Sequence, residues 1–373
     1  MQSFRKLFLA CSVVLGCAAT HAQSTDPLTF TSSSGSTTIY GTADLGYVDR
    51  WGSSPGNGDT RARGYQTAAG SDGSRVGIKI AYDLFDSTKL IGDVEYGVNP
   101  AGHEDAGSED RLLFTRVAYL GLAGNWGTFL GGKVDGARAT LLKTYDVFQG
   151  RSVASAGELQ IETTRANDAV AYITPVWKGL NVTLAYTWNL LGVASHDAAS
   201  PVYAVKLDYK NGPFQFSYDH EDEWWNSAPG LSRLFVNSAG ASYAFSRFTL
   251  MGFVDHTSIV RPFDPAALGY FQGHWGYSIG ASVPLSDVDL AKLSWNRRDS
   301  QYTHNRCDKW GVGYQHSLTK NFYLYTDFAT INNSHGGTCT IAYSNEQTSA
   351  DLGSSDAGGH GDRGVDTGFV YNF

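Results

Sequence analysis

Long stretches of the chain alternate between apolar residues and polar or small ones. In the segment NVTLAYTWN (181–189), Val182, Leu184, Tyr186 and Trp188 take every second position. Alternation over about ten residues predicts strands whose two faces meet different surroundings. The same pattern recurs along the chain, in TKLIGDVEYGV (88–98), VYAVKLDYK (202–210), HWGYSIGASV (274–283) and RGVDTGFVYNF (363–373).

The connections between the predicted strands alternate in length. The short ones are 83–88, 124–126, 211–212, 246–247 and 318–320. The long ones are 49–73, 99–110, 136–164, 190–200, 220–232, 257–272, 297–308 and 332–360. A soluble β-sandwich has no reason to separate its loops by length, whereas an outer-membrane barrel has short periplasmic turns and long extracellular loops. The pattern predicts an all-β, transmembrane, antiparallel up-and-down barrel of about sixteen strands, which is wide enough for an aqueous channel.

The chain ends on three aromatic residues spaced two apart, Phe369, Tyr371 and Phe373. This spacing places them on one face of a strand, and we expect that face to contact lipid. The opposite faces of the predicted strands then carry charges into the lumen, among them Arg75, Lys79, Asp93, Glu95 and Lys206. The abundance of Gly (43 residues) and of Tyr, Phe and Trp (21, 19 and 9) suits sheets with many turns.

The first 22 residues have the features of a secretory signal peptide. Arg5 and Lys6 precede a short apolar stretch that ends in Thr-His-Ala before Gln23. Cleavage there leaves residues 23–373 as a single barrel domain. An alternative is lipoprotein-type processing at Cys17. After cleavage 26 basic residues face 36 acidic ones, a formal charge of −10, which argues against nucleic acid as a partner.

Several segments are similar in sequence and order to strands of the Gram-negative general porin family, over nearly the whole mature chain. They are TTIYGTADLGYV (37–48), SRVGIKI (74–80), TRVAYLGLAGNWGTFLGGK (115–133), RANDAVAYITP (165–175) and GVGYQHSLTKNFYLYTDFA (311–329). The resemblance implies a homotrimeric diffusion pore in the outer membrane of a Gram-negative bacterium, surrounded by lipid and lipopolysaccharide. It also implies a third loop folded into the lumen. The chain departs from the family pattern at Asp168 and Ala169, and in a third loop (145–164) without the acidic, proline-containing signature.

By this resemblance, a basic wall faces the third loop at the narrowest point of the pore. The wall residues are Arg75, Arg116, Lys133 and Arg165, and the acidic residues of the loop are Asp146, Glu158 and Glu162. Fixed charges of opposite sign at a constriction focus an electric field. Each charge taken singly is explained equally well as an ordinary lumen residue solvated by channel water. In the trimer, contacts are expected from lipid-side residues of the first and last strands, namely Ile39, Leu45, Phe369 and Tyr371.

The mature chain contains two cysteines, Cys307 and Cys339, both near long loops. An even pair in an exported chain predicts a disulfide. The neighbouring His304 and His335 would complete a zinc-like ligand set, but the spacing matches no established zinc motif. We therefore expect a disulfide, with no metal site and no cofactor.

A channel for small hydrophilic solutes and ions is the predicted function, with a weak preference for anions. Acidic residues in the outer loops lie beyond the screening length of about 8 Å, so the basic wall dominates at the constriction. Two alternatives stay open, an outer-membrane barrel hydrolase and a secreted sugar-binding β-protein. Asp-His pairs at 219–220 and 255–256 suggest the hydrolase, but no nucleophile motif accompanies them.

Overall fold

The structure is a computed structural model that describes residues 28–54, 58–66, 70–99, 112–149, 152–156, 165–190, 200–227, 230–259, 273–300, 304–341 and 360–373. The expected signal peptide lies outside these residues. In the part of the chain that is described, no helix is long and apolar enough to cross a membrane.

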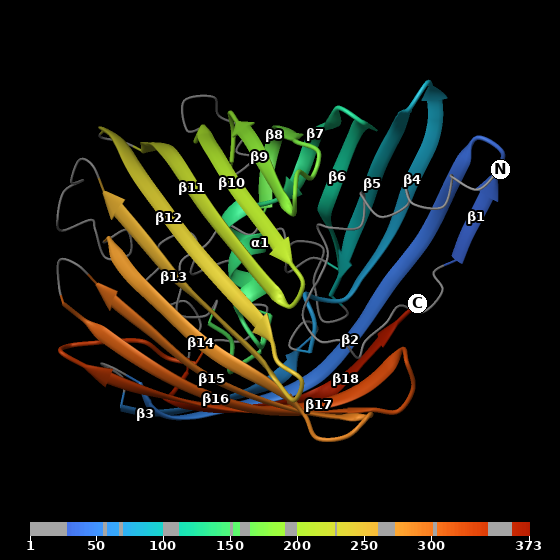
Figure 1. Ribbon diagram of the computed structural model, residues 1–373. Coiled ribbons are helices and arrows are strands. Elements are labelled where there is room, and N and C mark those ends of the chain that lie inside the picture. Colours follow the sequence, from blue (N-terminus) through green and yellow to red (C-terminus); the bar gives the residue numbers. More distant parts are fainter. Residues whose placement is uncertain are drawn as a thin grey trace.

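The described residues form one large antiparallel sheet and one short helix (Figure 1). The elements are β1 (Leu28–Ser32), β2 (Gly35–Ser54), β3 (Gly58–Gln66), β4 (Arg75–Phe85), β5 (Thr88–Val98), β6 (Leu113–Gly124), β7 (Gly127–Asp135), α1 (Ala137–Tyr145), β8 (Arg165–Ile173), β9 (Leu180–Thr187), β10 (Val202–Asn211), β11 (Phe214–Ser227), β12 (Gly230–Ala244), β13 (Thr249–Ile259), β14 (His274–Pro284), β15 (Asp289–Ser300), β16 (Arg306–Ser317), β17 (Phe322–Ser334) and β18 (Arg363–Asn372).

The sheet closes into a barrel because β2 pairs with β18 along one edge and with β4 along the other. β1 and β3 also pair with β2, where β18 and β4 do not reach. These two strands extend the wall, and the remaining 16 of the 18 strands surround the barrel. The prediction of a closed barrel of about sixteen strands is therefore confirmed.

The last residue of the chain is part of the barrel wall. The backbone N–H of Phe373 donates to the Gly41 carbonyl (3.0 Å), and the Gly41 N–H donates to the Phe373 carbonyl (2.9 Å). The rings of Tyr371 and Phe373 stack on the outer face and are each 42% exposed. The inward neighbour Val370 is fully buried. The terminal aromatics therefore face outward, as the spacing of two predicts.

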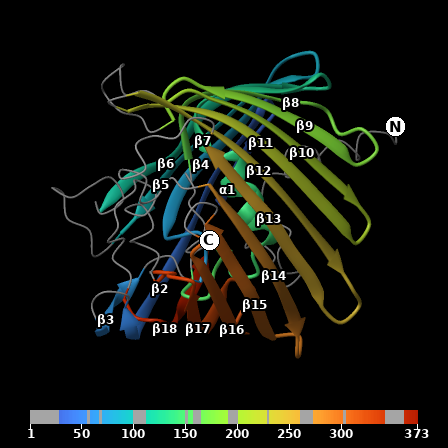
Figure 2. The same ribbon diagram turned by 90° about the vertical axis from the view of Figure 1, so that its left-hand side faces the viewer.

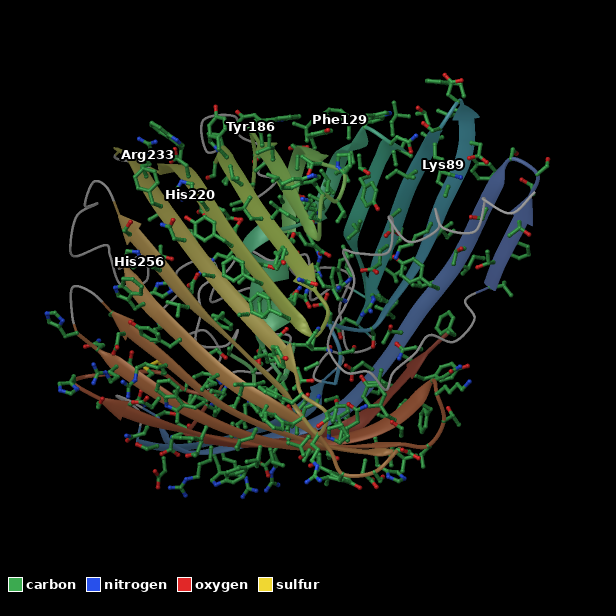
Figure 3. All side chains as sticks on the ribbon, in the orientation of Figure 1. Lys89, Phe129, Tyr186, His220, Arg233 and His256 are labelled. Atoms are coloured by element: carbon green, nitrogen blue, oxygen red, sulfur yellow. A yellow bond between two sulfur atoms is a disulfide. The ribbon has the colours of Figure 1, made fainter. Side chains whose placement is uncertain are left out.

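The alternation of exposure along the strands matches the alternation in sequence. On β14, Trp275 and Ile279 are exposed on the outer face, whereas Ser278 and Ser282 are buried on the inner face. Towards the end of the barrel that carries the long loops, the outer surface has both aromatic and polar side chains. The labelled Tyr186, His220, Arg233 and His256 are examples (Figure 3). The outer face is therefore the apolar and aromatic one, as a lipid-facing surface requires.

Five predicted long connections are partly strand, two of them (257–272 and 332–360) only over the last residues of β13 and β17. The segment 220–232 belongs mainly to the hairpin of β11 and β12, and 49–73 contains the end of β2 and the whole of β3. Segment 297–308 similarly contains the ends of β15 and β16. The loop prediction was wrong there because the inner face of the barrel is itself polar, so acidic residues also occur within strands. Glu221 of β11, for example, accepts a hydrogen bond from the Arg138 N–H (3.2 Å) inside the barrel.

Candidate functional site: the pore constriction

The connection between β7 and β8 enters the barrel and lies against its inner wall. We call residues 136–164 the constriction loop, of which 136–149 and 152–156 are described. Its helix α1 packs against β10, β11, β12 and β13, inside the ring of strands (Figure 2). The sequence resemblance predicted a third loop folded into the lumen, and the structure has this arrangement.

The wall is smooth where the constriction loop lies on it, because glycines replace inward side chains. A methyl group at Gly280 would lie 2.9 Å from Val147 Cγ1, and one at Gly311 would lie 2.7 Å from Ala154 Cβ. Such distances are too short for an added side chain, so the loop needs these glycines. The full set of glycines with their loop partners is Gly240 with Tyr145, Gly280 with Val147, Gly311 with Ala154, Gly313 with Phe148, and Gly364 with Val153.

Polar contacts hold the helix of the constriction loop to the wall. Arg138 binds Asp255 of β13 through two hydrogen bonds, from Nε to Oδ1 (2.9 Å) and from Nη2 to Oδ2 (2.5 Å). His274 lies 3.3 Å from the same carboxylate. The Tyr145 hydroxyl bonds to Ser217 of β11 (2.8 Å), and burial raises the pKa of Tyr145 to about 12, so the hydroxyl keeps its proton. Paired charges of this kind, excluded from water, fix the helix in one position.

Asp146 does not face the basic wall across the pore. Only 1% of its surface is exposed, and its carboxylate accepts hydrogen bonds from the backbone N–H groups of Phe148 (3.0 Å) and Ala156 (2.8 Å). The expected role of Asp146 as an acidic constriction residue is therefore corrected: the side chain holds the turn of the loop together. Glu158 and Glu162 lie outside the described residues.

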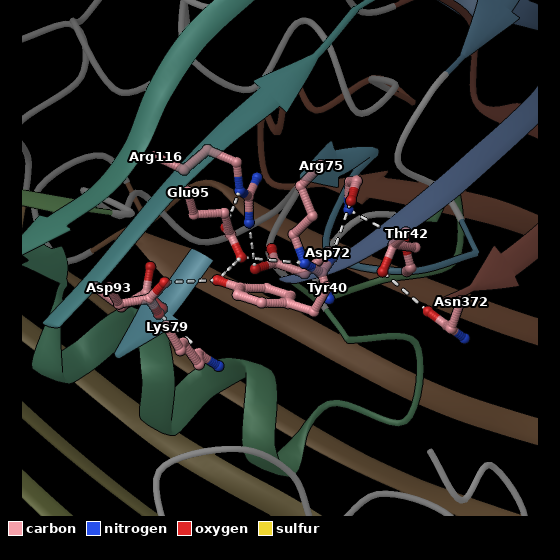
Figure 4. Close-up of polar contacts among 12 residues, drawn as sticks. Tyr40, Thr42, Asp72, Arg75, Lys79, Asp93, Glu95, Arg116 and Asn372 are labelled. Atoms are coloured by element: carbon pink, nitrogen blue, oxygen red, sulfur yellow. Dashed lines mark hydrogen bonds and ion pairs between the residues drawn. The ribbon is translucent and has the colours of Figure 1, made fainter. Parts of the chain in front are cut away.

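Arg116 of β6 lies at the centre of a charge network on the opposite wall (Figure 4). Its Nε donates to Glu95 Oε1 (2.6 Å) and its Nη2 donates to Asp72 Oδ2 (2.8 Å). Arg75 Nε approaches Glu95 Oε2 at 3.3 Å. Tyr40 adds a hydroxyl between the carboxylates, 2.9 Å from Asp93 Oδ1 and 3.0 Å from Glu95 Oε2. Two of the four predicted basic wall residues, Arg75 and Arg116, are thus brought together through Glu95.

Lys143 connects the constriction loop to this wall. Its Nζ lies 2.9 Å from Asp72 Oδ1, so Asp72 is shared between the helix and Arg116. Lys79 lies beside Asp93, with 3.8 Å between Nζ and Oδ2. We call Arg75, Lys79 and Lys143 the exposed cations, because their side chains are 21%, 36% and 15% exposed. Arg116 is only 4% exposed and so contacts the aqueous path far less than they do.

Of the other two predicted basic residues, Arg165 lies at the edge of the network. Arg165 begins β8 opposite Asp135, with 3.7 Å between Nε and Oδ1, and is 5% exposed. The charge of Asp135 also acts on Arg116, which links Arg165 to the network. Lys133 lies opposite Ala118, beside the irregularity in register between Gly132 and Val134. The role of Lys133 in the basic wall stays a prediction.

Sequence reasoning missed the role of Asp72, which it included in a long outer loop. The segment 70–74 instead turns into the barrel, where Ser71 donates to Asp44 Oδ2 (2.9 Å) and Tyr323 donates to the Gly70 carbonyl (2.6 Å). No local sequence signal marks this return. Arg138 and Asp255 were also missed as a pair, since 117 residues separate them.

Cys307 and Cys339 form a disulfide in the structure, with an S–S distance of 2.03 Å and a Cα–Cα distance of 6.1 Å. The two sulfur atoms of a disulfide are bonded to each other, so neither is available as a thiolate ligand for zinc. Among the residues that the structure describes, no group of three or more His, Cys, Asp or Glu side chains is arranged to hold a metal ion.

Comparisons with known proteins agree with this architecture. The family model described as Gram-negative porin matches residues 9–336. The chain is 25% identical over 352 residues to outer membrane porin protein 32 of Delftia acidovorans, covering 90% of this chain and 91% of the relative. Among solved structures, it resembles an anion-selective porin from Comamonas acidovorans, with a TM-score of 0.73 and 22% identity. The match covers 91% of this chain and 100% of that porin. It also resembles OmpF of Salmonella typhi in a complex with daunomycin, with a TM-score of 0.63 and 13% identity over 93% of this chain and 100% of OmpF. The chain belongs to the Gram-negative porin family and forms an outer-membrane channel, not an enzyme.

Proposed function

We propose that the protein is a passive diffusion channel for small hydrophilic solutes that favours anions weakly. The observation that carries this proposal is the exposure of charges at the constriction. Lys79 and Arg75 are 36% and 21% exposed, whereas the carboxylates that pair with them, Asp93 and Glu95, are 9% and 10% exposed. Lys143 is 15% exposed and its partner Asp72 is 26% exposed, but Asp72 is shared with Arg116. A permeating ion therefore meets Lys79 and Arg75 more directly than Asp93 and Glu95.

The charge count at the constriction supports a weak preference and argues against a strong one. Among the described residues of the network, the cations Arg75, Lys79, Arg116 and Lys143 face three anions, Asp72, Asp93 and Glu95, which leaves one positive charge. The negative charge of the whole chain has little influence there, because charges further away than about 8 Å are screened at physiological salt. A similar solved structure is described as an anion-selective porin, which agrees with this proposal.

The reversal potential of the reconstituted channel across a salt gradient tests the preference. We expect wild type to favour anions. Lys79→Glu and Lys143→Glu should each move the potential towards cations, because each replaces an exposed cation with an anion at the narrowest point. Lys320→Glu is the matched control, since Lys320 is exposed in the short turn between β16 and β17.

Two results would contradict the proposal. One is a cation-selective wild type. The other is a shift in Lys320→Glu as large as the shift in the two constriction variants, since this would show that the charge of the whole chain determines selectivity.

We also propose a homotrimer that uses the outer face of β2 and β18. Leu45 and Tyr371 are 39% and 42% exposed there, and Leu45 lies opposite Phe369 in the register. With Ile39 on the same strand, these residues offer an apolar surface to lipid or to another copy of the chain. One similar solved structure, OmpT of Vibrio cholerae, is described as a trimer form.

A further inference from the structure

The disulfide lies inside the barrel. Cys307 is 3% exposed and belongs to the inner face of β16, two and four residues before the inward Lys309 and Gly311. Lys309 Nζ donates to the carbonyl of Ser155, and Gly311 lies under Ala154 of the constriction loop. The disulfide is therefore on the same strip of wall that supports the constriction loop.

The disulfide holds the segment that follows β17 against this wall. We call residues 335–341 the return segment. Asn333 fixes Cys339 through two hydrogen bonds, from its side-chain amide to the Cys339 carbonyl (2.9 Å) and from the Cys339 N–H to its Oδ1 (3.0 Å). At the other end, the Ile341 N–H donates to the Gly361 carbonyl and the His360 N–H donates to the Ile341 carbonyl, both at 3.0 Å. Both ends of the Cys339–Ile341 stretch are thus tied to the barrel.

We call the described residues 152–156 of the constriction loop the loop tip. Ile341 lies against the loop tip above a glycine of the wall. A methyl group at Gly364 would lie 2.9 Å from Ile341 Cγ2 and 3.4 Å from Val153 Cγ1. Ile341 is fully buried and Val153 is 1% exposed. Both belong to one apolar cluster with Val147, Phe148, Ala154 and Cys307, against which Cys339 also packs. The return segment thus covers a side of the loop tip that would otherwise face water.

We propose that the Cys307–Cys339 disulfide and Ile341 are positioning residues for the pore. They hold the loop tip on the glycine-lined wall and keep the channel at one open width. Hydrogen bonds also bind the tip to the wall, from the Val153 N–H to Asp366 Oδ2 (2.8 Å), from Lys309 Nζ to the Ser155 carbonyl (2.9 Å) and from Ser294 Oγ to the Ala154 carbonyl (3.3 Å). The disulfide and Ile341 add the apolar cover of the Val153 side chain. The inference rests on the proposed channel function but does not depend on ion preference.

Reduction of the disulfide should loosen the return segment in the folded protein, because hydrogen bonds alone then hold it. Two molecules of a monothiol supply two electrons and two protons, form one small-molecule disulfide and leave two protein thiols. With the segment loosened, Ile341 covers Val153 less firmly, so excursions of the tip into the lumen become more frequent.

Single-channel recording in planar bilayers tests this inference, using the full-length channel. We expect Ile341→Ala and the double variant Cys307→Ala/Cys339→Ala to raise the ratio of closed to open dwell times by about tenfold at fixed voltage. Leu290→Ala is the matched control, because Leu290 is a buried inward residue of β15 outside the apolar cluster. Wild type treated with 2-mercaptoethanol should behave as the double variant, and the double variant should not respond to the thiol.

The outcomes separate positioning from general stabilisation. If closures stay at the wild-type rate in Ile341→Ala and in the double variant while heat stability falls, the disulfide only stabilises the fold and the inference is overturned. An equal rise in Leu290→Ala also overturns it. If the double variant does not fold, the reduced wild type decides by the same criterion. A wild type that conducts no ions would instead refute the channel function itself.

Discussion

At the scale of residues, Arg116 shows that a charge in the wall need not be a charge in the pore. Its guanidinium contacts Glu95 at 2.6 Å and Asp72 at 2.8 Å, and its side chain is 4% exposed. A buried charge that bonds to a buried carboxylate such as Glu95 is held firmly, and removal of the arginine leaves that carboxylate short of a partner. Arg116 therefore fixes Asp72 and Glu95, while the exposed cations meet the solutes.

This difference predicts unequal effects of two substitutions on stability. Arg116→Ala should lower the free energy of unfolding by about 3 kcal/mol, since it leaves two carboxylates short of a partner. Lys79→Ala should lower it by less than about 1 kcal/mol, because Lys79 is 36% exposed and its Nζ lies 3.8 Å from Asp93 Oδ2. Urea unfolding of the barrel in lipid vesicles, followed by tryptophan fluorescence, measures both. Equal losses in the two variants would contradict the structural role of Arg116.

At the scale of elements, the path of the constriction loop follows from the wall beneath it. A strand that faces water on its inner side normally carries polar side chains there. Where β14, β16 and β18 carry Gly280, Gly311 and Gly364 instead, the wall accepts the apolar side chains of the loop. The loop thus lies flat against the wall and leaves the rest of the lumen to water.

An added side chain at one of these glycines should push the loop into the pore. Gly280→Val should reduce single-channel conductance roughly twofold, because the new side chain takes the place of Val147 and narrows the open cross-section. Gly64→Val is the control, since a methyl group at Gly64 meets no atom within 4 Å. Unchanged conductance in a correctly folded Gly280→Val channel would show that the loop does not depend on the smooth wall.

The strands could be predicted from sequence because their signal is local. In β14, the residues that alternate in sequence are those that alternate in exposure. The constriction could be predicted only in part. Arg75 and Arg116 belong to recognisable strands, but Asp72 lies in a turn and Lys143 lies on α1. The positions of that turn and of α1 depend on contacts with distant residues. Asp146 has the same charge in sequence whether it faces water or caps a turn, so its role required the fold.

At the scale of the whole molecule, closure involves both ends of the described chain. β18 pairs with β2 from Thr42 to Trp51, and β1 pairs with β2 from Gly35 to Ile39. The two strands succeed one another along the same edge of β2, so the wall continues from the C-terminal strand into the N-terminal one. This junction presents Leu45 and Tyr371 on its outer face.

The location of the trimer contact on this junction can be tested with a matched pair of variants. Leu45→Arg should dissociate the trimer, because it places a charge in an apolar contact between subunits. Leu184→Arg, on the outer face of β9, should cost a similar free energy against lipid but leave the trimer intact, since Leu184 is 49% exposed on a distant strand.

Detergent gels of unheated and heated samples measure both, with the wild type expected as a trimer that becomes a monomer on heating. A wild type that runs at the monomer mass without heating would refute the trimer. Equal dissociation of the two variants would place the contact elsewhere, since a charge at the junction would then act no differently from a charge in lipid.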